Sequence, residues 1–285
     1  MNLREALRAG EEALKAAGIA DASTDARLLL EKAAGITLTE YALDPFREME
    51  EEGKKEYLEL IGRRTKRIPL QHLTGEQQFM GLSFQVNRDV LIPRQDTELL
   101  AEEALKLLKP GMHVLDLCTG SGCVIISLER IGKEKGLADG TSSFTGSDIS
   151  PEAVRTARAN AAQHQAGVRF EESDLFEKLE GGYDLIVSNP PYIRTAVIEE
   201  LEEEVRCHDP LLALDGKEDG LYFYRRIIRE AEGHLNPGGW LLFEIGYDQR
   251  EMVTELMMQR GYRQIRAKKD LAGLDRVVIG RYDRA

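Results

Sequence analysis

From about residue 113 onward, short apolar runs alternate with stretches of helical periodicity, and this alternation limits the possible folds to a few. We expect strands at 113 to 118, 143 to 148, 167 to 171, 183 to 188, 239 to 245, 262 to 268 and 275 to 282. Helices are predicted to separate the first five strands, which predicts a doubly wound α/β sheet with right-handed crossovers. The last two strands have no helix between them and should form an antiparallel hairpin.

Residues 1 to about 68 have helical rather than strand periodicity. Leu3, Leu7 and Leu14 share one helix face, and Gly35 is a normal helix end. The last of these helices runs into a basic cluster at residues 63 to 67, which we interpret as a solvated helix end, with contact to an acidic protein partner as the alternative. The pattern then changes to that of a hairpin over 73 to 93. The sequence therefore predicts a helical domain over residues 1–72, a β-hairpin linker over 73–93 and the sheet domain over 94–285.

Composition and charge exclude several classes of protein. No apolar run in the 285 residues approaches the roughly 18 that a membrane span needs, and the amino terminus lacks a signal-peptide pattern. The net charge of -12 repels polyanions, so no stable nucleic-acid complex is expected and a protein substrate fits better. The three cysteines form no CxxC pair, which argues against disulfides and structural zinc. We expect a cytoplasmic protein with no membrane contact.

A glycine turn follows the first predicted strand. Asp116 to Gly122 reads Asp-Leu-Cys-Thr-Gly-Ser-Gly and precedes an apolar helix, so a ligand can approach its backbone. A dinucleotide fingerprint would need a third glycine where Ile125 stands, which favours another nucleotide-like ligand. The alternative is a plain tight turn.

Two acidic residues follow the next two strands. Asp148 ends the second strand, where its carboxylate can accept hydrogen bonds from both hydroxyls of a ribose; the alternative is an aspartate that caps a helix. Asp174, after the third strand, could face an adenine amino group, or be a turn residue. Because the carboxyl ends of strands in an open α/β sheet line its ligand site, the acids and glycines together predict one binding site.

Asn189-Pro190-Pro191-Tyr192 follows the fourth predicted strand directly. The two prolines fix their own φ angles and restrict the residues before them, so the Asn189 side chain and the Pro190 carbonyl are held in defined directions. Two acceptors so placed can hold a planar NH2 group for chemistry. The alternative is a loop that happens to contain Pro-Pro.

This combination resembles class I S-adenosylmethionine-dependent methyltransferases, and specifically the protein-(glutamine-N(5)) methyltransferases that modify peptide chain release factors, the HemK/PrmC family. The resemblance covers nearly the whole chain. Its pieces are Arg67-Ile68-Pro69-Leu70-Gln71-His72-Leu73-Thr74-Gly75, Phe79, Leu91-Ile92-Pro93-Arg94-Gln95-Asp96-Thr97-Glu98, Asp116 to Gly122, Asn189 to Tyr192, Asp209-Pro210 with Ala213-Leu214, Asp219-Gly220, Glu244-Ile245-Gly246 and Asp275-Arg276.

The chain departs from the family pattern at two places. Cys118 stands where the family usually shows glycine, and Gln95-Asp96 where it usually shows Pro-Glu. Arg94, Thr97 and Glu98 remain, which favours the release factor branch over the branch that modifies a glutamine of a ribosomal protein.

The resemblance implies a function and a set of site residues. It implies a seven-stranded Rossmann-like sheet that binds S-adenosyl-L-methionine and releases S-adenosyl-L-homocysteine without a metal, release factors as protein partners, and a helical domain that recognises them. The implied substrate-binding residues are Asn189, Pro190, Pro191 and Tyr192, with Asn189, Pro190 and Tyr192 catalytic. The implied cofactor-binding residues are Cys118, Thr119, Gly120, Ser121, Gly122, Asp148, Asp174, Leu175 and Asn189.

Two other functions fit the same residues. Asn-Pro-Pro-Tyr also serves adenine N(6) methyltransferases, where the NH2 belongs to a flipped base. A non-catalytic adaptor that binds the cofactor and grips a partner through its helical domain is the third possibility.

Overall fold

The computed structural model describes residues 1–283, which form two compact units. The first unit comprises Met1–Glu76 together with Glu202–His208. The second comprises Gln77–Leu201 and the described residues from Asp209 onward. The hairpin of β1 (Glu76–Phe79) and β2 (Leu82–Gln85) thus lies mostly within the second unit, and its predicted status as a separate linker stays a prediction.

The first unit is built from helices. In chain order these are α1 (Leu3–Ala16), α2 (Ala22–Ala34), α3 (Leu38–Leu43), α4 (Glu51–Arg64), α5 (Leu70–Thr74) and α9 (Glu203–His208). Asn2 begins α1 with a capping box, and Gly35 ends α2 in the left-handed conformation. The core includes Leu14, Leu29 and Tyr57, which are fully buried.

Arg64 at the end of α4 is buried, so the interpretation of the basic cluster as a solvated helix end is wrong at this position. Its guanidinium donates to Asp25 Oδ2 at 2.7 Å and to Glu204 Oε1 at 2.8 Å. A buried guanidinium needs such partners because desolvating an unpaired charge is costly. The acids that pair with Arg64 are therefore residues of this chain.

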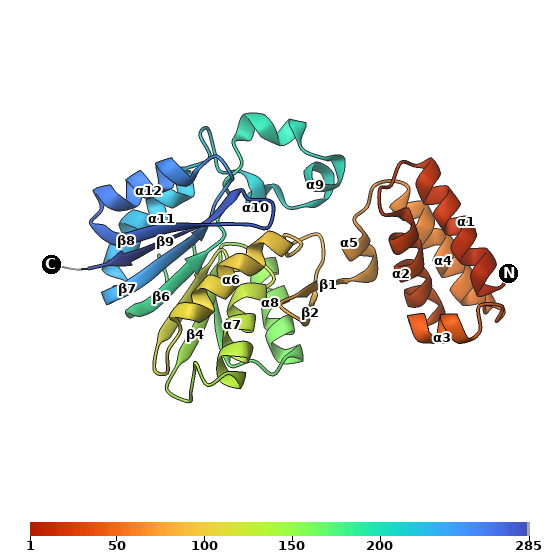
Figure 1. The fold of residues 1–285 in the computed structure, drawn as a ribbon, viewed down its shortest axis with the longest axis horizontal. Coiled ribbons are helices and arrows are strands. Elements are labelled where there is room, and N and C mark those ends of the chain that lie inside the picture. Colours follow the sequence, from red (N-terminus) through yellow and green to blue (C-terminus); the bar gives the residue numbers. More distant parts are fainter. Residues whose placement is uncertain (284–285) are drawn as a thin grey trace. The chain divides into compact units, whose positions relative to one another are not determined.

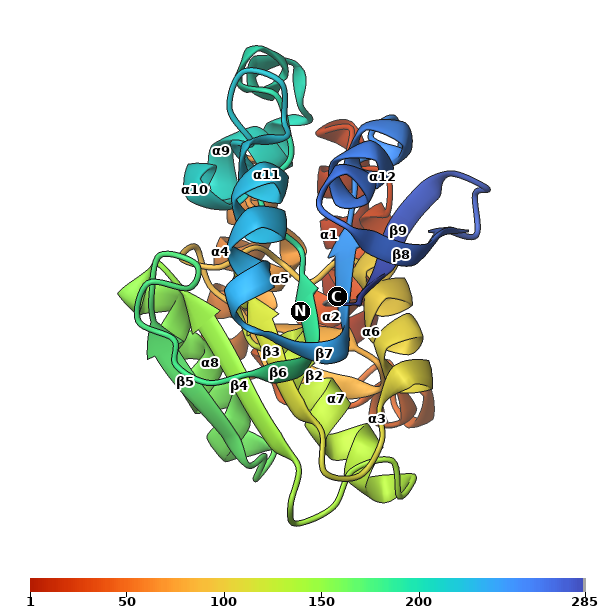
Figure 2. The ribbon, with the colours of Figure 1, turned by 90° about the vertical axis from the view of Figure 1, so that its left-hand side faces the viewer.

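The second unit contains a seven-stranded sheet in the order β5-β4-β3-β6-β7-β9-β8, seen in Figure 2 with β5 at the left and β8 at the right. Its strands are β3 (His113–Leu117), β4 (Ser143–Asp148), β5 (Val168–Glu172), β6 (Tyr183–Ser188), β7 (Leu235–Glu244), β8 (Tyr262–Lys269) and β9 (Asp275–Tyr282). The first five are parallel, and β9 runs antiparallel to both β7 and β8. The predicted doubly wound sheet and terminal hairpin are confirmed.

Helices cover both faces of this sheet (Figure 1). On one face lie α6 (Gln95–Leu107), α7 (Cys123–Glu134) and α8 (Pro151–Gln163), whose buried residues share one core with the strands. On the other lie α11 (Tyr222–Glu230) and α12 (Arg250–Gln259) with a second core. The short elements η1 (Thr195–Glu200), α10 (Leu211–Leu214) and η2 (Ala231–Gly233) complete the unit.

The prediction that helices separate the first five strands is wrong between β5 and β6. Residues 173–182 form turns there, and Leu175, Phe176 and Leu179 enter the second core from this segment. Ser173, Asp174, Gly181 and Gly182 favour turns in this segment, and Gly181 has a left-handed φ of 95°.

Within the residues that the structure describes, no helix is long and apolar enough to cross a membrane.

Candidate active site

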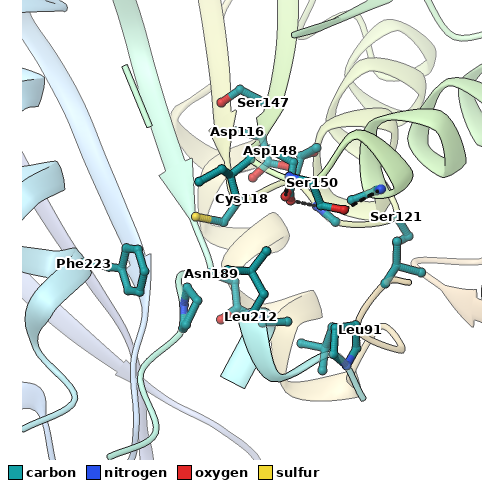
Figure 3. Close-up of a pocket in the computed structure, with 18 of the residues that line it drawn as sticks. Leu91, Asp116, Cys118, Ser121, Ser147, Asp148, Ser150, Asn189, Leu212 and Phe223 are labelled. Carbon is teal, nitrogen blue, oxygen red and sulfur yellow. Dashed lines mark hydrogen bonds between the residues drawn. The ribbon is translucent and has the colours of Figure 1, made fainter. Parts of the chain in front are cut away.

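The central strands β3 and β6 define the point where the sheet changes direction. The chain proceeds outward from β3 to β4 on one side, while β6 lies on the other, and the carboxyl end of such a strand pair is where open α/β sheets bind ligands. Leu117 pairs with Ser188 at these ends, and the Ser188 hydroxyl donates to the Leu117 carbonyl at 2.8 Å. A cavity of about 320 Å³ opens here, within the second unit (Figure 3).

The loop after β3 forms one wall of this cavity. Cys118, Gly120 and Gly122 all have left-handed φ values, of 59°, 55° and 80°. A Cβ on Gly122 would lie 2.9 Å from Ile126 Cδ1 and 3.1 Å from Ala157 Cβ, so only glycine fits there. Cys118 adopts its conformation despite carrying a side chain, which stores backbone strain at this loop.

Asp148 connects this loop to the start of α8. Its Oδ2 accepts from the Gly120 amide at 2.9 Å and its Oδ1 from the Ser150 amide at 3.0 Å. Burial raises the pKa of the Asp148 carboxyl, and these backbone amides oppose the shift. Since each carboxylate oxygen has a second lone pair, Asp148 can accept further hydrogen bonds from a ligand in the cavity.

Asp174 lies at the cavity with a cationic partner that the sequence did not reveal. Arg226 of α11 donates to both Asp174 oxygens, at 2.9 and 3.1 Å. The next residue, Leu175, has a φ of 51° and lines the same cavity. The ion pair holds the Asp174 carboxylate in one orientation.

Asp116 lies beneath the glycine loop and is fully buried. It accepts a hydrogen bond from the Thr119 hydroxyl at 2.7 Å, which fixes the loop from below. Burial raises the pKa of the Asp116 carboxyl to about 7.

Asn189 follows β6 and lines the cavity. Its side-chain Nδ2 donates to the hydroxyl of Thr97, a buried residue in the first turn of α6, at 3.3 Å. The nitrogen end of the carboxamide is therefore engaged, and the oxygen is left to accept a hydrogen bond from another group.

The structure brings most of the predicted site residues to one cavity. Pro191 and Asn189 line it, as do all of the predicted cofactor-binding residues except Gly122. Tyr192 lies against the second core, with its hydroxyl donating to Glu244 Oε1 at 3.3 Å. The roles predicted for these residues stay predictions.

Gln249 is a residue of this region that the sequence gave no reason to single out. Its Nε2 donates to the Tyr192 carbonyl at 3.0 Å and its Oε1 accepts from the Gly246 amide at 2.9 Å. Gln249 is 2% exposed, so these bonds do not compete with solvent. It fixes the backbone of the loop that carries Asn189.

Comparison with known proteins identifies the family. Residues 5–75 match the family described as the PrmC N-terminal domain, and residues 108–271 match a methyltransferase domain. The release factor glutamine methyltransferase of Caulobacter vibrioides is 42% identical, over 98% of this chain and 96% of its own length. That of Agrobacterium fabrum is 40% identical, over 96% of each chain. This chain belongs to the release factor glutamine methyltransferase family.

The resemblance inferred from the sequence motifs is thereby confirmed. A crystal structure of a methyltransferase from Pyrococcus furiosus is similar in fold, with 20% identity and a TM-score of 0.54 over 78% of this chain and all of that one. This chain thus shares its fold with a protein that is distant from it in sequence.

One of the two departures from the expected motif, at position 96, makes a defined contact in the structure. Asp96, where the family usually shows glutamate, makes an ion pair with Arg276 of β9, with Nη2 and Oδ2 3.2 Å apart. Arg276 also pairs with Asp270 at 3.0 Å. The shorter acid at position 96 therefore keeps a cationic partner.

Proposed function

We propose that this chain transfers a methyl group from S-adenosylmethionine to the side-chain amide nitrogen of the glutamine in the Gly-Gly-Gln motif of peptide chain release factors. The observation that carries this proposal is the Asn189 carboxamide, which is bound at its nitrogen end by Thr97 and lies at the cavity. Its oxygen is an acceptor for an N–H group. The names of the relatives supply the class of substrate.

The cavity suits S-adenosylmethionine. Its volume of about 320 Å³ lies in the usual range for small-molecule sites. Asp148 would hold the ribose hydroxyls, and Asp174 with Leu175 would face the adenine. A Cβ on Gly120 would meet no atom within 4 Å, so the backbone of the glycine loop is open on that side. The Ser147 hydroxyl, buried beside this cavity without a hydrogen-bond partner in residues 1–283, offers a further polar group.

The enzyme's task in this reaction is alignment. A glutamine amide is a poor nucleophile because its nitrogen lone pair is delocalised, whereas S-adenosylmethionine supplies a methyl group already activated by its sulfonium. Asn189 Oδ1 and the Pro190 carbonyl would accept the two N–H bonds and direct the nitrogen toward the methyl group. Tyr192 would pack on the planar amide and keep water out.

The proposed substrate is a protein. We place the reaction in the cytoplasm because translation factors act there. The helical first unit would recognise the release factor away from the reacting glutamine. The net charge of -12 disfavours a stable complex with nucleic acid.

Mass spectrometry of purified release factors incubated with this protein and S-adenosylmethionine tests the proposal. We expect one methyl group on the Gly-Gly-Gln glutamine and none on a ribosomal protein or adenine-containing DNA offered in parallel. Methylation of either of those instead would overturn the substrate assignment, and cofactor binding without any transfer would indicate an adaptor.

A pair of variants tests the role of Asn189 in the same assay. Asn189→Ala should lower the rate by roughly 10²- to 10³-fold, as the loss of a preorganised polar contact does in other enzymes. Asn236→Ala is the matched control, because Asn236 also donates one side-chain hydrogen bond, to Asp184 at 2.8 Å, and does not line the cavity.

A further inference from the structure

The cofactor cavity has to accommodate one anionic group, the carboxylate at the amino-acid end of S-adenosylmethionine. The residues proposed to bind this cofactor include two acids and no cation. Backbone amides of the glycine loop are possible donors, but those of Thr119, Gly120 and Gly122 already donate to acceptors of the chain, at 2.9, 2.9 and 2.8 Å. Because a desolvated carboxylate is costly without partners, a further donor is needed.

Three cationic side chains line the cavity within residues 1–283, and two of them pair with acids close to it. Arg226 donates to both oxygens of Asp174, so its guanidinium is used to hold that acid. Lys217 donates to Asp215 Oδ2 at 2.9 Å, two residues away in the chain. The third cation is Arg94.

Arg94 is anchored and still has donors to offer. Its Nη2 donates to Asp209 Oδ2 at 2.6 Å, and the Asp209 side chain is 1% exposed. Within residues 1–283 this is the hydrogen bond recorded for the Arg94 side chain, whereas a guanidinium carries five N–H donors in a planar fork. The Arg94 side chain is 44% exposed and lines the cavity, so its other donors are accessible to a ligand.

The place of Arg94 in the fold suits the amino-acid end of the cofactor. In the sheet, β5 and β4 carry Asp174 and Asp148 at their carboxyl ends, and β3 and β6 follow in that order. A ligand with its adenine at Asp174 and its ribose at Asp148 therefore extends across β3 toward β6. Arg94 directly precedes α6, and the Thr97 hydroxyl of that helix accepts from Asn189, which follows β6. Arg94 thus lies on the side of the cavity away from the adenine.

We propose that the Arg94 guanidinium, held in place by Asp209, binds the carboxylate of S-adenosylmethionine. An arginine fork matches a carboxylate with two parallel hydrogen bonds, which gives direction as well as attraction. The buried Asp209 orients the guanidinium before the ligand arrives, and this lowers the entropic cost of binding. The inference rests on the proposed function, because the direction of the ligand follows from the roles given there to Asp148 and Asp174.

A pair of matched ligands tests the contact in the wild-type protein. Decarboxylated S-adenosylmethionine lacks the carboxylate and keeps the adenosine, the sulfonium and the amino group. Calorimetry should show that it binds roughly 10- to 100-fold more weakly than S-adenosylmethionine, which is the range for hydrogen bonds to charged groups.

Variants of the cations assign this preference to one residue. Arg94→Met should weaken S-adenosylmethionine by the same factor and leave the decarboxylated ligand unchanged, so that the preference disappears. Arg94→Lys keeps the charge without the planar fork and should reduce the preference several-fold. Lys217→Met, which removes the alternative cation, should leave the preference intact.

Arg250→Met is the matched control for the loss of an arginine. The Arg250 side chain is 47% exposed and its Nη1 lies 3.4 Å from Asp275 Oδ2, so it resembles Arg94 in exposure and in having one acidic partner. Arg250 does not line the cavity, and its variant should bind both ligands as the wild type does.

The inference and the proposed function fail in different ways. Equal wild-type affinity for the two ligands would overturn the inference while methyl transfer to release factors stood, as would a preference that persists in folded Arg94→Met or disappears in Lys217→Met. Arg94→Met leaves the buried Asp209 carboxylate without its cation, so circular dichroism should confirm its fold. Should it not fold, Arg94→Lys decides, since an undiminished preference there would also overturn the inference. Binding of S-adenosylmethionine without methyl transfer would overturn the proposed function alone, because the ligand comparison measures affinity and not turnover.

Discussion

Gln249 donates its side-chain amide to the main-chain carbonyl of Tyr192 at 3.0 Å, and so fixes the end of the Asn-Pro-Pro-Tyr segment from the start of α12. The same Nε2 lies 3.3 Å from the Gly220 carbonyl, and Oε1 accepts from both the Gly246 amide and the Tyr224 hydroxyl. One buried side chain therefore joins several loops at the carboxyl edge of the sheet.

Gln249→Ala should lower both stability and turnover. It leaves buried carbonyl and amide groups unpaired, each of which costs about 1 to 3 kcal/mol, and it frees the loop that positions Asn189. Urea unfolding and the methylation assay measure the two effects. Gln259→Ala is the matched control, since Gln259 of α12 is exposed and its side chain donates to the exposed Glu255 at 3.1 Å. Equal behaviour of the two variants would contradict the role given to Gln249.

Gly220 lies in the loop before α11 and closely approaches the backbone of Tyr192, so Gly220→Ala should be strongly destabilising. A Cβ there would lie 2.4 Å from the Tyr192 carbonyl oxygen and 2.7 Å from Gln249 Nε2, at a φ of +74°. Gly273→Ala separates the cost of the close contact from the cost of the left-handed backbone. Gly273 has a φ of +81°, and an added Cβ would have no atom within 4 Å. Gly273→Ala should show only the left-handed backbone cost, roughly 1 to 2 kcal/mol. Similar unfolding midpoints for the two variants would exclude the close approach as the cause.

Sequence reasoning identified the site residues that directly follow a strand in the chain. The Asn-Pro-Pro-Tyr segment, the glycine loop and Asp148 each follow a strand directly, and a strand's end is recognisable from its apolar run and the turn residues after it. Because the carboxyl ends of parallel strands lie at one edge of the sheet, the sequence alone predicted that these segments lie close together.

The partners of these residues could not be found in the same way. Thr97 is 92 residues from Asn189, and Gln249 is 57 from Tyr192. Such pairs depend on how helices pack across the sheet, and a single Thr or Gln in a helix carries no signal of that packing. The pairing of Arg226 with Asp174 could not be predicted from the sequence for the same reason.

Local patterns also misled at two points. The segment between β5 and β6 contains enough apolar residues for a helix, but these residues enter the core from turns. The basic residues at the end of α4 were predicted to be solvated, whereas Arg64 is buried and pairs with two acids that are distant in sequence. Arg67 is partly buried and lies 3.8 Å from one of these acids, Glu204.

Arg64→Met should destabilise the first unit severely. It leaves the buried Asp25 carboxylate without its cation, and breaking one partner of a buried pair costs about 3 to 5 kcal/mol. Since Arg64 also binds Glu204, hydrogen exchange of residues 202–208 should become faster. Arg63→Met controls for the loss of charge, because Arg63 is exposed. Unchanged exchange in the Arg64 variant would show that Glu204 holds this segment by other contacts.

Asp116 should make the protein less stable as pH rises toward neutrality. Its pKa is raised from the ordinary 3.8 to about 7 in the folded state, so the folded protein binds a proton that the unfolded chain has lost. The stabilisation is therefore complete below about pH 4 and disappears as pH rises through about 7, with a slope near 1.4 kcal/mol per pH unit in between. Asp116→Asn, which can still accept from Thr119, should flatten this part of the curve. The remaining slope would come from Glu244, because burial raises the pKa of its carboxyl to about 7 as well.

Urea unfolding from pH 5 to pH 8 measures this slope. Asp139→Asn is the comparison, because Asp139 is exposed and hydrogen bonds from Thr141 lower its pKa. The stabilisation that Asp139 provides is present above its ordinary pKa and lost only as pH falls further, so its removal should leave the slope between pH 5 and pH 8 unchanged. A slope that Asp116→Asn does not reduce would mean that the carboxyl beneath the glycine loop is already ionised at pH 5, with solvent or a cation reaching it.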